Sequence, residues 1–231
     1  MLFRKLRLDW RYGISELLIV VAGVLIALAA DDWRQTRELR LAEQGAFSRL
    51  ASDMQADVRE FEGNRMRTRR GYEAAIWLME RRYGPAPPLD SLSAKITDFT
   101  ACSSFSPTIA EYTALKSSGT ISNLRDADFR ERMVNHYEEY PWVSGLYEDD
   151  CRFVEEGIVA IESHIELGLD ETGAGWPIVV IGDAAELLRN PTFQRTVGFA
   201  ANMRLFLAPH EEGFIAELGA LRERALELSV R

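Results

Sequence analysis

The chain has 231 residues, 47% of them hydrophobic, which is enough apolar surface for one or two compact domains and too much for a disordered chain. Its formal net charge is -9, and because residues 1–13 carry four basic side chains against one acid, residues 14–231 carry -12. This acidic body argues against nucleic acid as a partner, since nucleic-acid-binding surfaces gather Lys and Arg to meet phosphates. We interpret the four arginines within residues 65–70 as the solvated face of a helix.

Segment 14–33, ISELLIVVAGVLIALAADDW, predicts a transmembrane helix. Its unbroken run of apolar or small residues has 14 members, fewer than the roughly 20 that a bilayer core requires of a helix. Tyr12 and Trp33, however, lie 21 positions apart, about 31 Å along a helix, so they suit two interfacial anchors. We therefore expect this segment to lie in the lipid bilayer.

A cleaved secretory signal is the alternative interpretation of the same segment. It would consist of the basic tail, the apolar run and Ala27-Leu28-Ala29 as the cleavage site. We favour an uncleaved anchor because the helical pattern continues through Asp31-Asp32-Trp33, with no Pro or Gly where a signal peptide would end.

The orientation of the span does not follow from a count of basic residues, because four precede it and four follow it in residues 34–49. Long domains cross a membrane largely regardless of charge, whereas a short tail with four cations resists translocation. We therefore expect residues 1–13 in the cytoplasm, residues 14–33 in the membrane, and the body, residues 34–231, outside the cytoplasm.

One acid, Glu16, lies near the start of the apolar segment. It shares a helical stripe with four further residues, at spacings of four, three, four and three: Val20, Gly23, Ala27 and Ala30. Small residues at such spacing let two helices approach closely, and an intramembrane acid usually faces protein or water rather than lipid. The stripe therefore predicts contact with a second copy of the chain or with another membrane protein. The alternative is that Glu16 only reaches out to the headgroups.

After the span, apolar residues recur at helical spacing from Leu39 to Phe61, which predicts a long amphipathic helix leaving the membrane. Gly63-Asn64 is a candidate interruption, after which the pattern resumes as far as Met79. Residues 84–88, GPAPP, end the helix, because proline cannot continue it.

Two shorter helices are expected next. One covers residues 89–104, and the other starts near Pro107, where Ser106 can cap the free amides and proline suits the first turn. Ser118-Gly119 ends the second helix, at the expected place for a left-handed residue.

The next predicted helix begins at a cap, Asp126, and runs through Tyr140. Pro141 interrupts it, and residues 142–169 continue the helical pattern. A turn-rich break follows at residues 170–175.

Residues 178–181 are a short β-branched run that predicts a strand, although no second strand is evident to pair with it. Asn190-Pro191 opens a further helix by the same cap-then-proline pattern, and residues 209–230 give a last one. The predicted fold class is therefore all-α: an N-terminal transmembrane helix runs into a long amphipathic helix and a bundle of six or seven helices.

Two sequence blocks carry a resemblance to known proteins. The first is Tyr12-Gly13-Ile14-Ser15-Glu16 with Leu25-Ile26-Ala27-Leu28 and Asp31-Asp32-Trp33, and the second is YTALKSSG from Tyr112 to Gly119 with Ile121, Asn123, Leu124-Arg125 and His136-Tyr137. Together they resemble an uncharacterised family of bacterial single-span membrane proteins, over roughly half of the chain. That family usually has Gly before the acid and two Asn before the Trp, so Ser15, Asp31 and Asp32 depart from it. The resemblance implies placement in the inner membrane of a bacterium and a helical body, and it supplies no mechanism.

Histidines and carboxylates give one candidate metal pattern. His136 and Glu139 share a helical face at i, i+3, the pairing that di-metal bundles use, but such a site needs the motif twice. Glu162 and Glu166, which flank His164, do not repeat it. We therefore interpret His136 as a surface histidine among carboxylates and expect no metal site.

Motifs of known enzyme classes do not occur in the sequence: it has no Gly-x-Ser-x-Gly, no His-Glu-x-x-His and no phosphate-binding loop. Gly173-Ala174-Gly175 precedes an apolar run instead of following it, unlike a dinucleotide site. We expect no enzyme activity and no cofactor.

The most individual residues of the body lie near Gly119 and in the helix that follows it. We interpret them as packing between two consecutive helices, with a ligand pocket as the alternative. They are Tyr112, Leu115, Lys116, His136 and Tyr137.

The two cysteines, Cys102 and Cys151, are too few for a disulfide scaffold and lack metal-type spacing. A single bridge between them fits a body in an oxidising compartment. Two unpaired thiols in the core are the alternative.

These patterns favour a non-enzymatic membrane protein whose helical body takes part in protein interaction or assembly. The tail of residues 1–13 is too short for an output domain, so any signal would pass through a partner along the face of Glu16, Gly23 and Ala27. A body that senses a small molecule in a pocket between helices is the second hypothesis. A hydrolase or metal enzyme that uses His136 and Glu139 is the third.

Overall fold

The computed structural model describes residues 10–168 and 177–230, with side chains from residue 14 onward. The first nine residues of the expected cytoplasmic tail and the turn expected over residues 170–175 lie outside the described residues.

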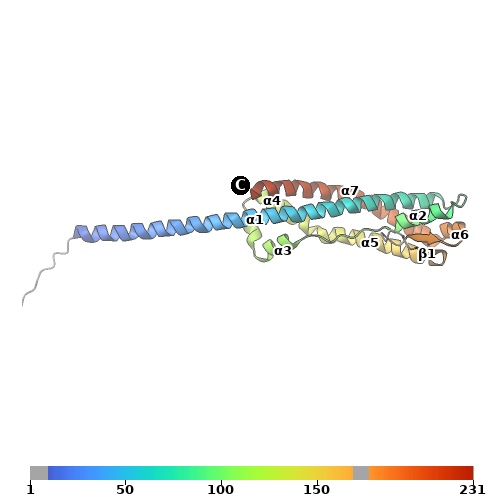
Figure 1. Cartoon of the computed structure of the whole chain (residues 1–231), viewed down its shortest axis with the longest axis horizontal. Helices are drawn as coiled ribbons and strands as arrows, with labels where there is room; N and C mark the ends of the chain where they lie inside the picture. Colours follow the sequence, from blue (N-terminus) through green and yellow to red (C-terminus); the bar gives the residue numbers. More distant parts are fainter. Residues whose placement is uncertain (1–9, 169–176, 231) are drawn as a thin grey trace, which may run out of the picture.

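Two long helices form the spine of the molecule and lie side by side in opposite directions (Figure 1). Helix α1 (Trp10–Glu80) has 71 residues, and helix α7 (Pro191–Ser229) has 39. Helix α5 (Tyr140–Val159) packs along α7 as the third member of the bundle. Only the later part of α1 lies in this bundle, because residues 14–42 are exposed.

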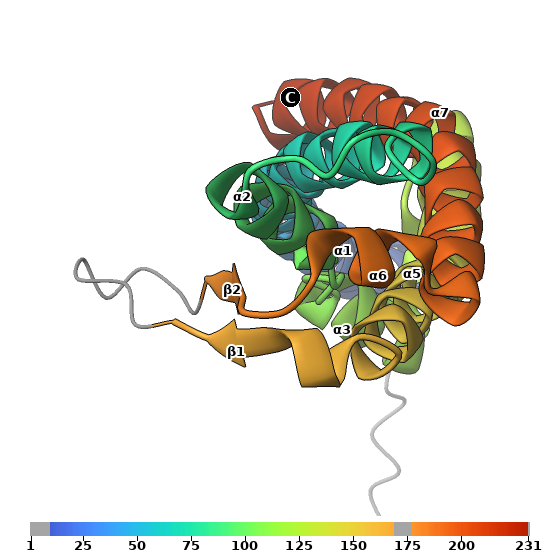
Figure 2. The same ribbon diagram turned by 90° about the vertical axis from the view of Figure 1, so that its right-hand side faces the viewer.

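Shorter elements surround the two ends of the bundle. Near the point where α1 enters lie α3 (Ala110–Ser117), the 3-10 helix η1 (Thr120–Asn123) and α4 (Ala127–Glu138). At the far end, seen end-on in Figure 2, lie α2 (Leu89–Thr100), the 3-10 helix η2 (Glu162–His164), β1 (Ile165–Leu167), β2 (Ile178–Val180) and α6 (Ala184–Arg189). The predicted all-α class is confirmed, since the described part of the chain is mostly helical and its two strands form one small sheet.

Two apolar cores follow one another along the bundle. The core near the entry of α1 is rich in aromatic rings, among them Phe47, Phe61, Phe129, Tyr140 and Phe214. The far core contains Leu78, Ile96, Phe99, Leu187 and Phe193. Buried polar side chains from α1, α5 and α7 lie between the two cores; we call Thr68, Tyr147, Asp150, Arg204 and Glu211 the polar layer.

Both long helices continue where the sequence predicts an interruption. Asn64 is buried, and its Nδ2 donates to the carbonyl of Ser104 at 2.8 Å, so its side chain does not compete for the hydrogen bonds of its own helix. Pro209 lies inside α7 and cannot donate to the carbonyl of Leu205. Leu205 is exposed, which leaves that carbonyl near water. The expected breaks at Gly63-Asn64 and before Pro209 are therefore wrong.

The segment between α2 and α3 is longer than predicted, and Ser106 and Pro107 do not start a helix. Residues 101–109 lie outside regular structure. Their amides find partners on α1 instead of in a helical turn: Ser106 N donates to Glu60 and Thr108 N donates to Asp57, each at 2.8 Å. Contacts across 46 and 51 residues of sequence thus replace the expected cap.

The expected helix over residues 142–169 is also wrong in its last part. Helix α5 ends at Val159, and β1 pairs antiparallel with β2, with Ile165 opposite Val180 and Leu167 opposite Ile178. The predicted strand over residues 178–181 therefore has a partner. The amides of Ile178 and Val180 donate to Thr97 and Ser93 of α2, each at 2.9 Å, which satisfies the outer edge of β2.

Three predicted helix boundaries are confirmed. Asp126 caps α4 by accepting from Phe129 N at 3.0 Å, and Asn190 caps α7 by accepting from Phe193 N at 3.0 Å. Gly119, just beyond the end of α3, has a φ of 71°, the left-handed conformation that favours glycine.

Candidate functional site

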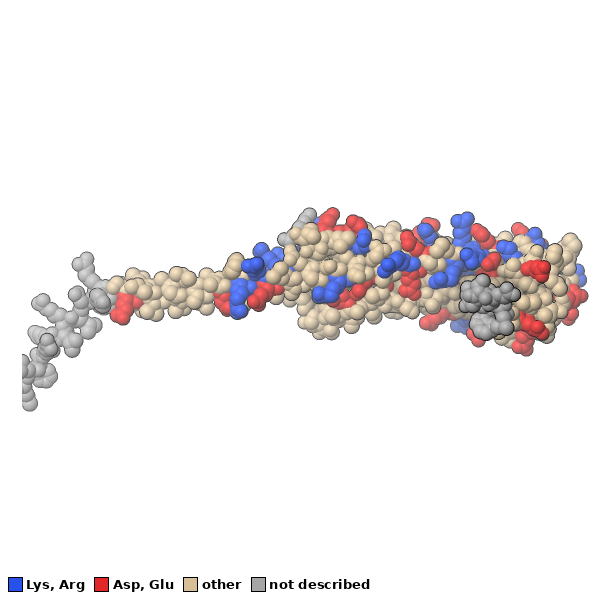
Figure 3. Space-filling view, in the orientation of Figure 1, with Lys and Arg blue, Asp and Glu red and all other residues tan. Residues whose placement is uncertain are grey.

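The N-terminal part of α1 is long and apolar enough to cross a membrane, and no other helix in the described part of the chain meets that test. None of this stretch is buried against the rest of the molecule. Figure 3 shows it as a slender uncharged rod between one acidic spot and a belt of charge. By its length and apolar composition, this exposed stretch is a candidate membrane span.

The structure places the predicted Glu16 stripe on this rod, without any contact to the body. Its five members, Glu16, Val20, Gly23, Ala27 and Ala30, are all exposed. A Cβ added to Gly23 would meet nothing within 4 Å, so no part of the described molecule covers the stripe at Gly23. Trp33 is exposed at the other end of this rod, and the side chain of Tyr12 lies outside the described residues.

Residues 31–42, which we call the stalk, are exposed helix that joins the apolar rod to the body. Local ion pairs and hydrogen bonds support it: Asp31 accepts from Arg34 at 3.1 Å and from Gln35 at 2.8 Å, and Arg34 lies 3.7 Å from Glu38. Such pairs three or four residues apart stabilise an isolated helix. The stalk therefore stays helical without tertiary packing.

The body and the Glu16 stripe lie on opposite sides of α1. Ala46 and Leu50 are the first core residues of α1 in the bundle. At about 100° per residue they lie about 160° and 200° around the helix axis from Ala30, the last member of the stripe. A second helix along the stripe would therefore not collide with the body.

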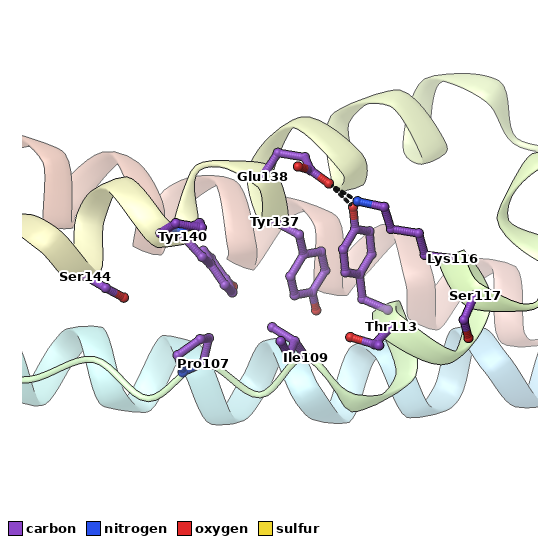
Figure 4. A pocket seen from close by; sticks show the side chains of 11 residues that line it. Pro107, Ile109, Thr113, Lys116, Ser117, Tyr137, Glu138, Tyr140 and Ser144 are labelled. Atoms are coloured by element: carbon purple, nitrogen blue, oxygen red, sulfur yellow. Dashed lines mark hydrogen bonds and ion pairs between the residues drawn. The ribbon is translucent and has the colours of Figure 1, made fainter.

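Three of the predicted pocket residues come together beside α3 and α4 (Figure 4). The rings of Tyr112 and Tyr137 stack with centroids 4.4 Å apart. Tyr112 Oη donates to Glu138 Oε1 at 2.8 Å, and Lys116 Nζ donates to the same oxygen. Burial raises the pKa of Tyr112, and the Lys116 ammonium lowers the pKa of Glu138. These residues line a cavity of about 490 Å³, which we call the tyrosine cavity.

The other two predicted pocket residues lie elsewhere. Leu115 is buried on the opposite side of α3, facing α1. His136 is only 5% exposed, with its ring 5.2 Å from that of Tyr140 and 5.0 Å from that of Phe214. Burial lowers the pKa of His136 to about 4.

The interpretation of His136 as a surface histidine is therefore wrong, and Glu139, its predicted partner, is exposed. The spacing of four, three and four from Phe129 through Met133, His136 and Tyr140 is the sequence signal that places His136 on the core face. Within residues 14–168 and 177–230, no group of three or more His, Cys, Asp or Glu side chains is arranged to hold a metal.

Cys102 and Cys151 are joined by a disulfide. The bridge ties the irregular segment after α2 to the middle of α5, across 49 positions of sequence. Of the two alternatives that the sequence leaves open, the structure contains the paired form.

The polar layer is the buried feature that the sequence does not reveal. Glu211 accepts from Thr68 at 2.7 Å and from Tyr147 at 2.9 Å, which joins α7 to α1 and α5. Burial raises the pKa of Glu211. Closer to the stalk, Asp57 accepts from Tyr140 at 2.7 Å. Such buried networks fix the positions of the helices relative to one another.

A larger cavity, of about 700 Å³, lies between the stalk end of α1 and the α3–η1 segment; we call it the stalk cavity. It lies on the other side of α3 from the tyrosine cavity. The α3 residues that line the stalk cavity are Glu111, Ala114 and Leu115, whereas Tyr112, Thr113 and Lys116 line the tyrosine cavity.

Comparison with protein-family models, with curated proteins and with solved structures finds no match to this chain.

Proposed function

We propose that the chain is a non-enzymatic, single-span membrane protein whose helical body acts outside the cytoplasm in protein interaction or assembly. One observation carries this proposal: α1 runs for 71 residues from the exposed apolar stretch into the core of the bundle without a break. A continuous helix ties the orientation of the body to that of the span. A contact made in the membrane therefore sets the position of the body.

The partner contact in this proposal is the Glu16 stripe. A carboxyl group in the span is costly unless it faces protein or water, and small residues on the same stripe permit close helix packing. Because the body lies on the other side of α1, a partner helix has free access to the stripe. The partner is a second copy of the chain or another membrane protein.

The disulfide supports the proposed side of the membrane. Disulfides persist outside the cytoplasm and are rare inside it. Exposed Met66, changed to cysteine, tests this placement. In intact cells a membrane-impermeant maleimide should label Met66→Cys as fully as it does after lysis. Labelling only after lysis would place the body in the cytoplasm.

The test of the partner contact is the mass and composition of the full-length protein in mild detergent. Glu16→Ala and Gly23→Leu alter the stripe, whereas Leu18→Ala and Leu25→Ala alter the opposite side of the same helix and serve as controls. We expect a stoichiometric partner, or a homo-oligomer, that is lost in the first pair and kept in the second. A monomer in the wild type, or equal loss in all four variants, would contradict the proposal.

A second candidate function is the sensing of a small molecule, and the tyrosine cavity favours it. Stacked rings beside a lysine and a glutamate offer an apolar surface with polar groups that orient a ligand. In a screen of metabolites, a ligand that binds the cavity should then raise the Tm of the full-length protein in detergent, and Tyr137→Leu should abolish the rise. A complete screen without a shift would count against sensing.

A further inference from the structure

The stalk cavity has an apolar interior. On α1 it is lined by Leu39, Ala42 and Ala46, and on the facing segment by Ala114, Leu115 and Leu124. Leu39 is 71% exposed although it belongs to this lining. Covering such a side chain with an apolar ligand is favourable, at about 25 cal/mol per Å². The cavity therefore suits a hydrocarbon chain better than a polar solute.

Two ion pairs hold the walls of the cavity together. Arg49 of α1 makes two parallel hydrogen bonds to Glu111 of α3, at 2.6 and 2.9 Å. Glu43 of α1 accepts from the side chain of Arg125 at 2.6 and 2.8 Å and from its backbone amide at 3.0 Å. Both carboxylates are largely covered, with side chains 12% and 14% exposed. These contacts fix the α3–η1 wall over α1, so the cavity exists without a ligand.

Arg40 gives the cavity its remaining charge. Three arginines and two glutamates line the cavity, and the two pairs above neutralise four of these charges. Within the described residues Arg40 has no acidic partner, so one positive charge remains in a body that is otherwise acidic. The lining thus combines an apolar interior with a single site for an anion.

The cavity begins close to the membrane. Thr36, its first lining residue, lies three positions after Trp33, which is about 5 Å along the helix axis. If Trp33 marks the interface, as the proposed function holds, the end of the cavity nearest Trp33 opens at the headgroup layer. Arg40 lies one turn farther from the membrane along α1, where it can reach the phosphate of a lipid that has moved partly out of this layer.

We propose that the stalk cavity binds one anionic phospholipid of the adjacent leaflet, with an acyl chain between α1 and α3 and the phosphate at Arg40. A volume of about 700 Å³ lies within the usual range of small-ligand pockets and is enough for one acyl chain. The second acyl chain stays in the bilayer. Bound lipid fills the space between the stalk and the α3–η1 wall. The proposal rests on the membrane placement in the proposed function and not on the Glu16 contact.

The test uses the full-length protein in nanodiscs of phosphatidylcholine, alone or mixed equally with phosphatidylglycerol. After release into mild detergent, native mass spectrometry should find one phosphatidylglycerol retained per chain. Ala42→Trp fills the cavity and should reduce retention about tenfold. Leu41→Trp, the neighbouring exposed residue that does not line the cavity, is the matched control and should retain lipid as the wild type does.

Arg40→Gln tests the headgroup contact. It should remove the preference for phosphatidylglycerol over phosphatidylcholine, a change of about tenfold, while one lipid still binds. No retained lipid in the wild type, or equal retention in Ala42→Trp and Leu41→Trp, would overturn the proposal. A dimer that Ala42→Trp separates would overturn it in favour of a second copy in the cavity.

Failure of the proposed function looks different. A protein without a span would not enter the nanodiscs at all, and a body on the other side of the membrane would alter the maleimide labelling of Met66→Cys. Neither result depends on Ala42 or Arg40. Loss of the partner in Glu16→Ala with lipid retained would likewise separate the two proposals.

Discussion

Arg204 of α7 and Asp150 of α5 form an ion pair inside the bundle, with Arg204 Nε 3.0 Å from both carboxylate oxygens. Their side chains are 0% and 4% exposed. Arg204 also donates to the carbonyl of Phe99 at 2.9 Å. The pair thus connects α7, α5 and the end of α2 at the level where the two apolar cores meet.

Removing one partner of this pair should cost more than removing both. Asp150→Leu leaves a buried guanidinium without its acid and should lower the free energy of unfolding by about 3–5 kcal/mol. Adding Arg204→Met removes the unpaired charge and should restore part of that loss. Denaturant unfolding of the two variants and the wild type measures both steps. A double variant less stable than Asp150→Leu would show that the long Arg204 side chain matters for packing more than for charge.

Gly71→Ala should destabilise the protein, although alanine is the better helix former by about 1 kcal/mol. A Cβ at Gly71 would lie 2.6 Å from Arg204 Cζ, and Asp150 and Phe99 hold that guanidinium in place. We expect a loss of about 2 kcal/mol, typical of an overpacked core. Gly213→Ala is the control, since its Cβ would meet nothing within 4 Å, and it should gain stability. Equal effects of the two substitutions would contradict this assignment.

Loss of the disulfide should lower the free energy of unfolding by about 4 kcal/mol, because the bridge closes a loop of 49 positions. The variant to measure carries both Cys102→Ser and Cys151→Ser. Reduction of the wild type should lower its free energy of unfolding by the same amount as the double substitution does. Reductant should leave the stability of the double variant unchanged. A reductant effect on the double variant would mean that the loss has another cause.

His136 should make the protein less stable in acid. Its pKa falls from 6.5 to about 4 on folding because of burial, so the unfolded chain takes up the proton first. Stability contributed by the neutral ring is complete above pH 6.5 and is lost as the pH falls toward 4, by about 3 kcal/mol in total.

The comparison that isolates this effect is the wild type against His136→Phe, unfolded with denaturant at each pH. Burial raises the pKa of Asp57 and of Glu211, so the protonation of these two acids stabilises the folded protein as the pH falls. They act equally in both proteins and cancel in the difference. Glu217, whose charge raises the pKa of His136, is present in both as well. A difference that stays constant from pH 7 to pH 4 would refute the assignment.

Signals within a few residues of one another predicted much of the fold. The caps at Asp126 and Asn190 and the left-handed turn at Gly119 depend on one or two neighbouring amides, so the sequence reveals them directly. The helical class follows in the same way from apolar spacing. Tyr112 of α3 and Tyr137 of α4 stack on one another and also line the tyrosine cavity.

Features that depend on distant residues were not predicted. Helix α1 continues past Asn64 because a carbonyl 40 positions away takes its side-chain hydrogen bond. Residues 165–167 form a strand because β2 offers them an edge, which overrides a helical pattern. The polar layer and the walls of the stalk cavity likewise rest on pairs separated by 54 to 143 positions. No local pattern encodes such pairs.

Because the stalk is an unbroken helix, the number of residues in it sets the direction in which the body points around the axis of α1. One residue inserted into residues 31–42 would turn the body by about 100° around the axis of α1 and raise it by about 1.5 Å. Seven inserted residues would complete two turns to within about 20° and raise the body by about 10 Å. The first insertion should swing the bundle toward the side of the proposed partner helix at Glu16, and the second should preserve the arrangement with the body farther from the apolar rod. Insertions in the stalk can thus change the rotation of the body and its distance from the apolar rod separately.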